Sequence, residues 1–438
     1  MKSFHFILPT LVFLALATGL VTGSNFFNNT VFGLAVVNQT SNAKMFYQFI
    51  PATGYTIENT TKPTILFMQG GPGCSSQLAN LGEIGPYSVE NDNGTLNLVP
   101  RNYSWSSEAN LMFLDNPTNV GYSQPGSQIV IDSNTSAQQI QNLLEQFFHN
   151  YTNLAALDFW VMGESYGGHY VPAIAYQLLS NGSAALPKLT GIAMQNPWTD
   201  AFYQLESFGV AAYAMGIIDP QSRDRIQSLI TEGREVILNG SYAQGFDYFD
   251  EIESYLQSFQ VSGSVFLNNY RYYSVGQPSP KIGPVFGNAG QYLNQTDVKV
   301  NFGMPADFNY QLCDSPTYSN WAVDISKSYL GVLAYVLERT KVVIFNGADD
   351  MECNTAGVLG FVNQINWSGR PVYKKASKVA WQMKGNNVVG TARVGGNLTF
   401  LTVYGAGHFV PFDQPYSSLD MVQRLMAGND NWNEPFNL

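Results

Sequence analysis

The sequence predicts an α/β fold in which a central, mostly parallel sheet is flanked by helices on both faces. Two observations carry this prediction: short apolar runs typical of buried strands recur along the chain, and segments with helical spacing separate many of them. A strand buried on both faces reads as a continuous apolar run, and parallel neighbours need a helical connection. With 438 residues, 45% of them hydrophobic, the chain can hold one large domain, or one domain that carries a substantial insertion.

Six apolar runs are predicted to be strands, and they are 65–68, 111–114, 159–162, 192–194, 342–345 and 400–403. Helical spacing is found in 137–148, 169–180 and 415–426. The alternation stops after Asn196-Pro197-Trp198-Thr199-Asp200, and residues 201–325 read first as helical and then as aromatic and irregular. A stretch of this length without structure would be unusual. We therefore predict a cap subdomain inserted at about 201–325.

Residues 1–23 have the pattern of a secretory signal peptide, which leaves 24–438 as the folded domain. Lys2 supplies the positive end, a mostly apolar run follows, and Val21 and Gly23 fit a cleavage site for small residues. The alternative is a membrane anchor, which we disfavour because the run is short for a bilayer and no second span follows. Twelve Asn-x-Ser/Thr sequons predict N-linked glycans and agree with the secretory pathway.

The formal net charge of −11 narrows the classes of partner and compartment. Nucleic acid is disfavoured as a partner because phosphates require basic patches. An acidic compartment suits the composition, since protonation of carboxylates would reduce self-repulsion. We expect a lysosomal or vacuolar location, or full secretion, and the sequence does not separate these destinations.

The pentapeptide Gly163-Glu164-Ser165-Tyr166-Gly167 lies between the strand predicted at 159–162 and the helix predicted at 169–180. Gly-x-Ser-x-Gly at a strand-to-helix turn is the nucleophile elbow of the α/β-hydrolases, in which small flanking residues allow close backbone approach while the hydroxyl is exposed. In a chain with 40 glycines the pattern alone is weak, so its context must support it. We predict an α/β-hydrolase fold with Ser165 as the nucleophile.

A serine at such an elbow needs a histidine base that comes later in the chain. The chain has four histidines. His5 lies in the signal peptide, and His149 abuts a sequon and should be exposed. His169 follows Ser165 on the same helix, where its ring should point away from the hydroxyl. This leaves His408, in a loop directly after a predicted strand, as the base.

The acid of the site must hold the imidazole tautomer and stabilise the imidazolium. The strand predicted at 342–345 leads to Asp349 and Asp350, at the C-terminal edge of the sheet where such sites form. The residues alone do not choose between these two carboxylates.

Three cysteines, Cys74, Cys313 and Cys353, predict one disulfide and one free thiol in an oxidising compartment. The chain contains no Cys-x-x-Cys motif and few histidines, so we expect no metal site. The Gly-Gly-Pro-Gly run at 70–73 is not followed by the Lys-Ser/Thr of a phosphate loop, and we expect no cofactor.

The motifs together resemble the serine carboxypeptidases, α/β-hydrolases that remove C-terminal residues from peptides. The matching segments are 69–76 (QGGPGCSS), 163–172 (GESYGGHYVP), 347–354 (GADDMECN) and 405–415 (GAGHFVPFDQP). Aligned on Cys353-Asn354, the resemblance assigns the triad acid to Asp350 and places Asp349 at a variable position. Ala348 departs from the family pattern, which has an aspartate there.

The resemblance implies further roles for residues around the elbow. The backbone N–H groups of Gly71 and Tyr166 would form the oxyanion hole. Residues that would bind the substrate's terminal carboxylate are Gln69, Gly70, Glu83 and Glu164. The glutamates would titrate as a pair, donate hydrogen bonds while protonated and repel the carboxylate when ionised, which predicts activity favoured at acidic pH.

The resemblance also implies a disulfide between Cys74 and Cys313, with Cys353 as the free thiol. Two departures concern the strand that leads to the oxyanion loop: Phe67 and Gln69 stand where the family commonly has tryptophan and asparagine. Gln69 resembles the vitellogenic-like branch, and its amide can still donate a hydrogen bond to a carboxylate.

The sequence therefore predicts a serine carboxypeptidase that acts on peptide or protein C-termini through an acyl-enzyme. Two alternatives stay open: an acyltransferase that uses the same triad, and a non-catalytic partner that stabilises other lysosomal hydrolases. A lipase or esterase is less favoured because it would have no use for the glutamate pair. A homodimer is left open.

Overall fold

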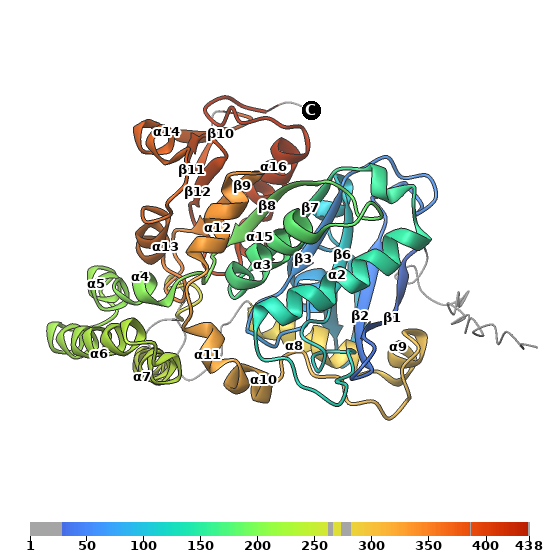
Figure 1. Ribbon diagram of the computed structural model, residues 1–438, viewed down its shortest axis with the longest axis horizontal. Coiled ribbons are helices and arrows are strands. Elements are labelled where there is room, and N and C mark those ends of the chain that lie inside the picture. The colour runs from blue at the N-terminus through green and yellow to red at the C-terminus, as the bar shows by residue number, and fades with distance from the viewer. Residues whose placement is uncertain (1–28, 262–265, 273–281, 386, 437–438) are drawn as a thin grey trace, which may run out of the picture.

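The structure, a computed structural model, describes residues 29–261, 266–272, 282–385 and 387–436. The predicted signal peptide lies outside these residues. A ten-stranded sheet forms the centre of the molecule (Figure 1), and its strands in spatial order are β1 (Val31–Asn38), β2 (Ala43–Ile50), β6 (Asn110–Leu114), β3 (Thr64–Met68), β7 (Phe159–Glu164), β8 (Leu189–Gln195), β9 (Lys341–Gly347), β12 (Leu398–Val403), β11 (Asn387–Gly395) and β10 (Lys378–Met383).

The sheet is mixed, with a parallel centre and antiparallel edges. The six consecutive strands from β6 to β12 pair in parallel, whereas β1, β2, β11 and β10 pair antiparallel with their neighbours. All six strands predicted from apolar runs are these central ones. The strands without such a prediction lie toward the edges, where β1, β10 and β11 are only partly buried and their sequences mix polar and apolar residues.

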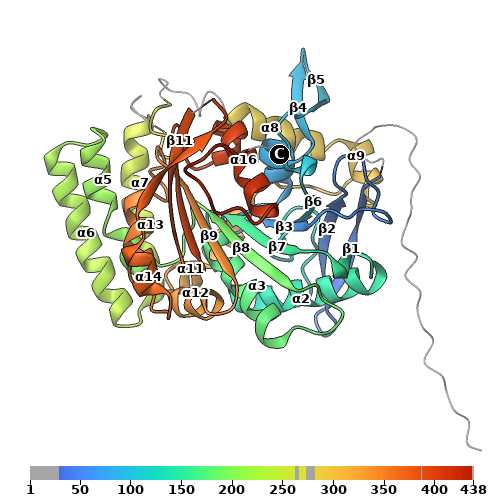
Figure 2. The same cartoon turned by 90° about the horizontal axis from the view of Figure 1, so that it is seen from above.

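Helices cover both faces of the sheet because successive residues of each strand point to opposite sides. In β7, Val161 belongs to the core cluster under two long helices, while Trp160 and Met162 belong to the cluster under the C-terminal helix. Figure 2 shows α2, α3 and α12 on one side and α16 on the other. The bounds of these helices are α2 (Ser133–Asn150), α3 (Gly167–Asn181), α12 (Leu330–Leu337) and α16 (Pro415–Met426).

The chain between β8 and β9, where we predicted the cap, forms several helices before α12. They are α4 (Ala201–Leu205), α5 (Phe208–Ala214), α6 (Pro220–Leu238), α7 (Tyr242–Val261), α8 (Ile282–Leu293), α9 (Thr296–Asn301), α10 (Ser315–Asn320) and α11 (Ala322–Ile325). Helices α5, α6 and α7 project together at one end, whereas α8 packs beside β4 on the other side of the molecule (Figures 1 and 2). The segment between β8 and β9 therefore lies on two sides of the molecule.

The remaining elements are short. They are the hairpin β4 (Tyr87–Asp92) and β5 (Thr95–Pro100), the helices α1 (Gln77–Ala79), α13 (Thr355–Val362), α14 (Arg370–Lys375) and α15 (Val410–Asp413), a π-helical turn at Asn80–Ile84, and 3-10 turns at Trp105–Ser107 and Leu154–Ala156. Cys74 and Cys313 form a disulfide, the pairing that the resemblance implied, and Cys353 is free and buried. Among the described helices, none is both long and apolar enough to cross a membrane.

Candidate active site

Ser165 occupies a tight turn between β7 and α3. Its φ of +60° lies in the left-handed region that non-glycine residues rarely adopt. The turn is held by its own backbone, because the Ser165 N–H donates to the Gln195 carbonyl at 3.0 Å and the Ser165 carbonyl accepts from Trp198 N–H at 2.8 Å. The predicted elbow geometry is therefore present, with the side chain directed toward a cavity of about 330 Å³.

The glycines around the elbow differ in how closely they approach other backbone. A Cβ at Gly163 would lie 2.8 Å from the Met68 carbonyl oxygen, so this glycine is required, as predicted. At Gly167 the same oxygen would be 3.5 Å away, an ordinary contact, so the expectation of a close approach there is wrong. The close approach falls on Gly168 instead, whose Cβ would lie 2.3 Å from the Trp198 carbonyl oxygen.

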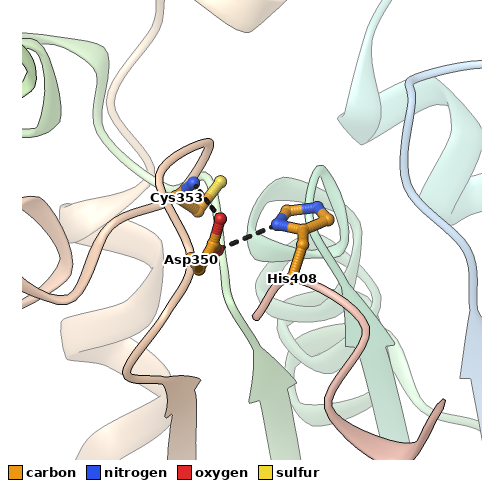
Figure 3. A group of neighbouring side chains, drawn as sticks. All are labelled: Asp350, Cys353 and His408. Atoms are coloured by element: carbon orange, nitrogen blue, oxygen red, sulfur yellow. Dashed lines mark hydrogen bonds and ion pairs between the residues drawn. The ribbon is translucent and has the colours of Figure 1, made fainter. Parts of the chain in front are cut away.

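His408 and Asp350 form a hydrogen-bonded pair at the same sheet edge (Figure 3). Nδ1 of His408 lies 2.9 Å from Oδ2 of Asp350, and both side chains are buried. The carboxylate is itself held by donors: Asn196 Nδ2 at 2.6 Å on Oδ2, and the N–H groups of Glu352 at 2.8 Å and Cys353 at 3.2 Å on Oδ1. These contacts orient the carboxylate toward the imidazole.

The structure separates the two candidate aspartates. Among the described residues, Asp349 forms no hydrogen bond or ion pair with His408. Its carboxylate pairs with Arg271, whose Nε lies 2.7 Å from Oδ2. Asp350, the neighbour favoured by the resemblance, is the carboxylate that contacts His408. The backbone after β9 thus sends consecutive side chains to different partners.

The other described histidines lie elsewhere. His149 is exposed at the end of α2. His169 is buried between the rings of Tyr166 and Tyr329, at centroid distances of 4.5 and 4.3 Å, and its Nδ1 is 3.7 Å from Asp324. His169 therefore packs, as expected, and His408 is the described histidine that lines the cavity beside Ser165.

Burial and the neighbouring carboxylates act on the pKa of His408 in opposite directions. Burial alone lowers the pKa of His408, but the nearby carboxylates of Asp350 and Glu352 outweigh this effect and raise the pKa to about 9. Its Nε2 lies 3.6 Å from Glu352 Oε2. These carboxylates therefore stabilise the imidazolium that forms when His408 accepts a proton.

Two backbone amides beside the serine are available as donors. Within the described chain, the N–H groups of Gly71 and Tyr166 have no hydrogen-bond acceptor, and both residues line the cavity. Gly71 has φ of +115°, a conformation that favours glycine. Tyr166 lies at the start of α3, where unpaired N–H groups point out of the helix. Such a pair of amides can bind a developing oxyanion.

Gly70 offers a test of how tightly the oxyanion loop is packed on the elbow. A Cβ there would lie 2.6 Å from Tyr166 N and 2.7 Å from Ser165 Cβ. We expect Gly70→Ala to cost about 1–3 kcal/mol of stability through overpacking. Because the nucleophile and an amide would both move, we also expect roughly a 10²-fold loss of kcat. Thermal unfolding and steady-state kinetics measure the two effects.

The matched control is Gly331→Ala, in α12, where a Cβ would meet no atom within 4 Å. Alanine should be tolerated there, or slightly stabilising, since it favours the helix. Equal behaviour of the two variants would contradict the packing argument.

Glu83 and Glu164 are buried carboxyls that share a hydrogen bond. Burial raises the pKa of Glu83 to about 7, and burial together with the charge of Glu83 raises the pKa of Glu164 well above its usual range. Gln69 Nε2 donates to Glu164 Oε1 at 2.6 Å. Glu164 and Gln69 line the cavity, whereas Glu83 is not among its lining residues. Glu164 is therefore the member of the pair that faces the cavity, and Glu83 supports it through the shared hydrogen bond.

Sequence analysis missed two polar residues that organise this site. The Gln195 amide donates to Glu164, to Glu83 Oε2 at 3.4 Å and to the carbonyl oxygen of His408 at 3.2 Å. Asn196 holds Asp350 and accepts from Gly347 N–H at 3.2 Å. Gln195 is the last residue of β8, and Asn196 follows it directly before the Pro197-Trp198 pair. Their position at a strand end next to the elbow strand was the signal that could have found them.

The structure also tests whether a metal could bind here. The side chains of Asp350, Cys353 and His408 offer ligand atoms within 4.8 Å of one another (Figure 3). Burial, and then the charge of Asp350, raise the pKa of the Cys353 thiol well above its usual value, so it keeps its proton. Since the carboxylate already accepts several hydrogen bonds, this set fits a hydrogen-bonded pair better than a metal site.

The fold and this arrangement of serine, histidine and aspartate define an α/β-hydrolase. The family model for serine carboxypeptidases matches residues 23–428, and the chain belongs to that family. It is thus a serine-type carboxypeptidase, a hydrolase.

Named relatives agree with the family. The chain is 31% identical over 403 residues to serine carboxypeptidase S10 family member 1 of Dictyostelium discoideum, which covers 89% of this chain and 92% of the relative. It is 32% identical over 398 residues to carboxypeptidase Y of Candida albicans, covering 88% and 71%. These relatives do not single out the vitellogenic-like branch suggested by Gln69, and that assignment stays a prediction.

A solved structure shows the same fold. The prohormone-processing carboxypeptidase Kex1 from Saccharomyces cerevisiae superposes with a TM-score of 0.77, at 22% sequence identity, over 92% of this chain and 93% of its own. At this identity the likeness is one of fold, and the roles of individual residues rest on the geometry above.

Proposed function

We propose that this carboxypeptidase uses Ser165 as nucleophile, His408 as base and Asp350 as the acid that orients the imidazole. The observation that carries the proposal is the Asp350–His408 pair, which opens into the same cavity as Ser165. Ser165 Oγ attacks the carbonyl carbon of the penultimate residue and His408 accepts its proton. The proton then passes to the leaving amine, and water hydrolyses the acyl-enzyme by the reverse transfers.

The oxyanion formed in each step is placed against the N–H groups of Gly71 and Tyr166. Donors already fixed by the fold stabilise charge in the transition state without reorganising. Residues 201–325 act as the cap in this proposal, because Phe208, Phe249, Phe286 and Tyr318 line the cavity. They shield the reacting atoms from water.

An enzyme that cleaves only at the C-terminus of a peptide needs a receptor for the free carboxylate. We assign this receptor to Gln69 and Glu164, with Glu83 behind them. Gly70 holds the oxyanion loop against the turn that contains Ser165. A protonated Glu164 donates a hydrogen bond to the substrate carboxylate. When pH rises through about 7, the value to which burial raises the pKa of Glu83, the pair gains negative charge. Binding of a free C-terminus is therefore strong in mild acid and weak above neutrality.

Equilibrium binding tests this assignment without the contribution of His408 to the rate. The Ser165→Ala variant is titrated calorimetrically with a blocked dipeptide acid, from about pH 5 to pH 8, a range in which the peptide carboxylate stays ionised. We expect at least about a tenfold loss of affinity across this range, because the pair becomes more negative. Glu83→Gln should flatten the dependence, since an amide cannot ionise.

The C-terminal amide of the same dipeptide serves as the control ligand, and its affinity should change little with pH. Equal affinities of acid and amide at every pH would contradict the assignment of the glutamate pair. That result would leave the roles of Ser165, His408 and Asp350 to be judged by kinetics.

We further propose that the chain enters the secretory pathway, with a lysosome, a vacuole or the exterior as its destination. The pattern of residues 1–23 and the twelve sequons support this route. Expression in a secretory host, followed by glycosidase treatment and N-terminal sequencing, tests the leader and the glycans together.

A further inference from the structure

The cavity beside Ser165 has two chemically different ends. One end contains Gln69 and Glu164, together with the rings of Phe286 and Phe409, which meet edge to face with centroids 4.9 Å apart. The other end is formed by Trp198, Phe249 and Tyr318 from the cap side, with the Trp198 and Phe249 rings 4.7 Å apart. Two carboxylates, those of Glu253 and Glu352, line this second end.

Glu253 and Glu352 reach the cavity from distant parts of the chain. Glu253 lies on α7, and Glu352 follows β9 two residues after Asp350. Oε2 of Glu352 is 3.6 Å from His408 Nε2, which places this carboxylate beside the reacting centre. Glu253 accepts a hydrogen bond from Gln257 Nε2 at 3.2 Å. The two carboxylates thus extend from the reacting centre toward the cap.

No fixed cation compensates this pair. Across the described residues, neither carboxylate forms an ion pair with a lysine or arginine, and the imidazole of His408 is the charged partner of Glu352. Burial, and then the charge of Glu352, raise the pKa of Glu253 to about 7, as expected for acids that face each other in an apolar cavity. Uncompensated carboxylates in such a cavity favour a cationic ligand.

We propose that Glu253 and Glu352 form a subsite for a basic side chain on the penultimate residue of the substrate. This inference rests on the proposed function, because the terminal carboxylate at Gln69 and Glu164 fixes the direction of the peptide. Ser165 attacks the carbonyl of the penultimate residue, so that residue's side chain lies on the opposite side of the serine from the carboxylate receptor. The preferred substrates are peptides with Lys or Arg directly before the last residue.

The shape of this end fits a lysine or arginine side chain. Both side chains have an apolar stem and a charged tip, and they cover apolar surface with the stem while the tip binds acceptors. Trp198, Phe249 and Tyr318 provide the apolar wall, and the carboxylates provide the acceptors. An uncharged side chain of equal length would keep the packing against the apolar wall and lose the interaction with the carboxylates.

The test compares two blocked dipeptides that end in leucine, one with lysine and one with norleucine as the penultimate residue. Norleucine keeps the stem and lacks the ammonium group. At about pH 6.5 we expect kcat/KM to favour the lysine peptide by about tenfold, as expected for a charge-assisted hydrogen bond. Glu253→Gln and Glu352→Gln should each reduce this ratio, and the double variant should bring it to about one.

The ratio is used because Glu352→Gln also changes the charge beside His408 and so affects both substrates. The matched control is Glu251→Gln, on the same helix, where the glutamate is exposed and pairs with Arg225. Its ratio should equal that of the unmodified enzyme, since an exposed pair contributes little. A ratio of one or less in the unmodified enzyme, or a preference that survives the double substitution, overturns the proposal.

Binding separates this outcome from failure of the proposed function. In Ser165→Ala, the lysine dipeptide should bind about tenfold more tightly than the norleucine dipeptide. If the unmodified enzyme releases leucine from both peptides equally, the proposed function stands and the acidic subsite is wrong. If it releases leucine from neither peptide, the proposed function is wrong, and the binding comparison still decides whether the subsite recognises a cation.

Discussion

Replacing Ser165 by alanine is expected to lower kcat by roughly 10⁵- to 10⁶-fold, the size of loss that removal of a serine nucleophile causes in enzymes of this mechanism. In the proposed mechanism the hydroxyl oxygen of Ser165 forms the acyl-enzyme, and no other described serine lines the cavity. Because alanine is smaller than serine and adds no polar group, the fold should be preserved. The rate of amino-acid release from a blocked dipeptide in mild acid measures the effect.

The matched control is Ser180→Ala, on α3 as well but exposed near its end. Its hydroxyl donates to the Tyr176 carbonyl within the helix, so its loss should leave the rate unchanged. The unfolding temperatures of both variants should match that of the unmodified protein. Retention of full peptide-trimming activity by Ser165→Ala would show that the central assignment is wrong.

Replacing Asp350 by asparagine is expected to lower kcat by about 10⁴-fold. The asparagine keeps the shape of the aspartate, but its amide cannot stabilise the imidazolium of His408, and it favours the wrong tautomer. In the structure, Oδ2 of Asp350 is 2.9 Å from His408 Nδ1 and also accepts from Asn196. Steady-state kinetics over a range of pH, with circular dichroism to check folding, measures the effect.

The neighbouring substitution Asp349→Asn is the sharpest control that the chain offers. It makes the same chemical change one residue away, in a carboxylate that pairs with Arg271 instead of His408. We expect it to leave kcat within about tenfold, since the expected loss is that of a single ion pair that is partly exposed. Similar losses in both variants would contradict the assignment of the acid to Asp350.

The success of the sequence in finding the sheet depended on burial. The six central strands are covered on both faces, so each contains an uninterrupted apolar run that stands out in the sequence, as in 159–162 and 342–345. Strands β1, β10 and β11 near the edges are partly exposed, and their polar or glycine residues interrupt the apolar runs by which strands were predicted. The antiparallel strands β1, β10 and β11 were missed for this reason, whereas β2 is almost wholly buried and was missed because Lys44 and Gln48 interrupt its apolar residues.

The residues of the candidate site also divide into those that the sequence predicted and those that it missed. Ser165 and His408 could be predicted as nucleophile and base because a short motif, chain order and the scarcity of histidine left few choices. The choice between Asp349 and Asp350 needed either the family pattern or the direction in which consecutive side chains leave the turn after β9. Gln195 and Asn196 were missed because no local pattern distinguishes an amide that bridges two carboxyls from one that faces water.

The sequence by itself determined the class of fold and the family, and it predicted the proposed nucleophile and base, since each of these depends on local motifs and on their order along the chain. Only the tertiary structure decided which carboxylate contacts His408, that Gly168 and not Gly167 makes the close approach, and that Glu253 and Glu352 meet in one cavity. The physical reason is distance along the chain. Contacts between segments as far apart as α7 and the turn after β9 exist only once the sheet has brought them together.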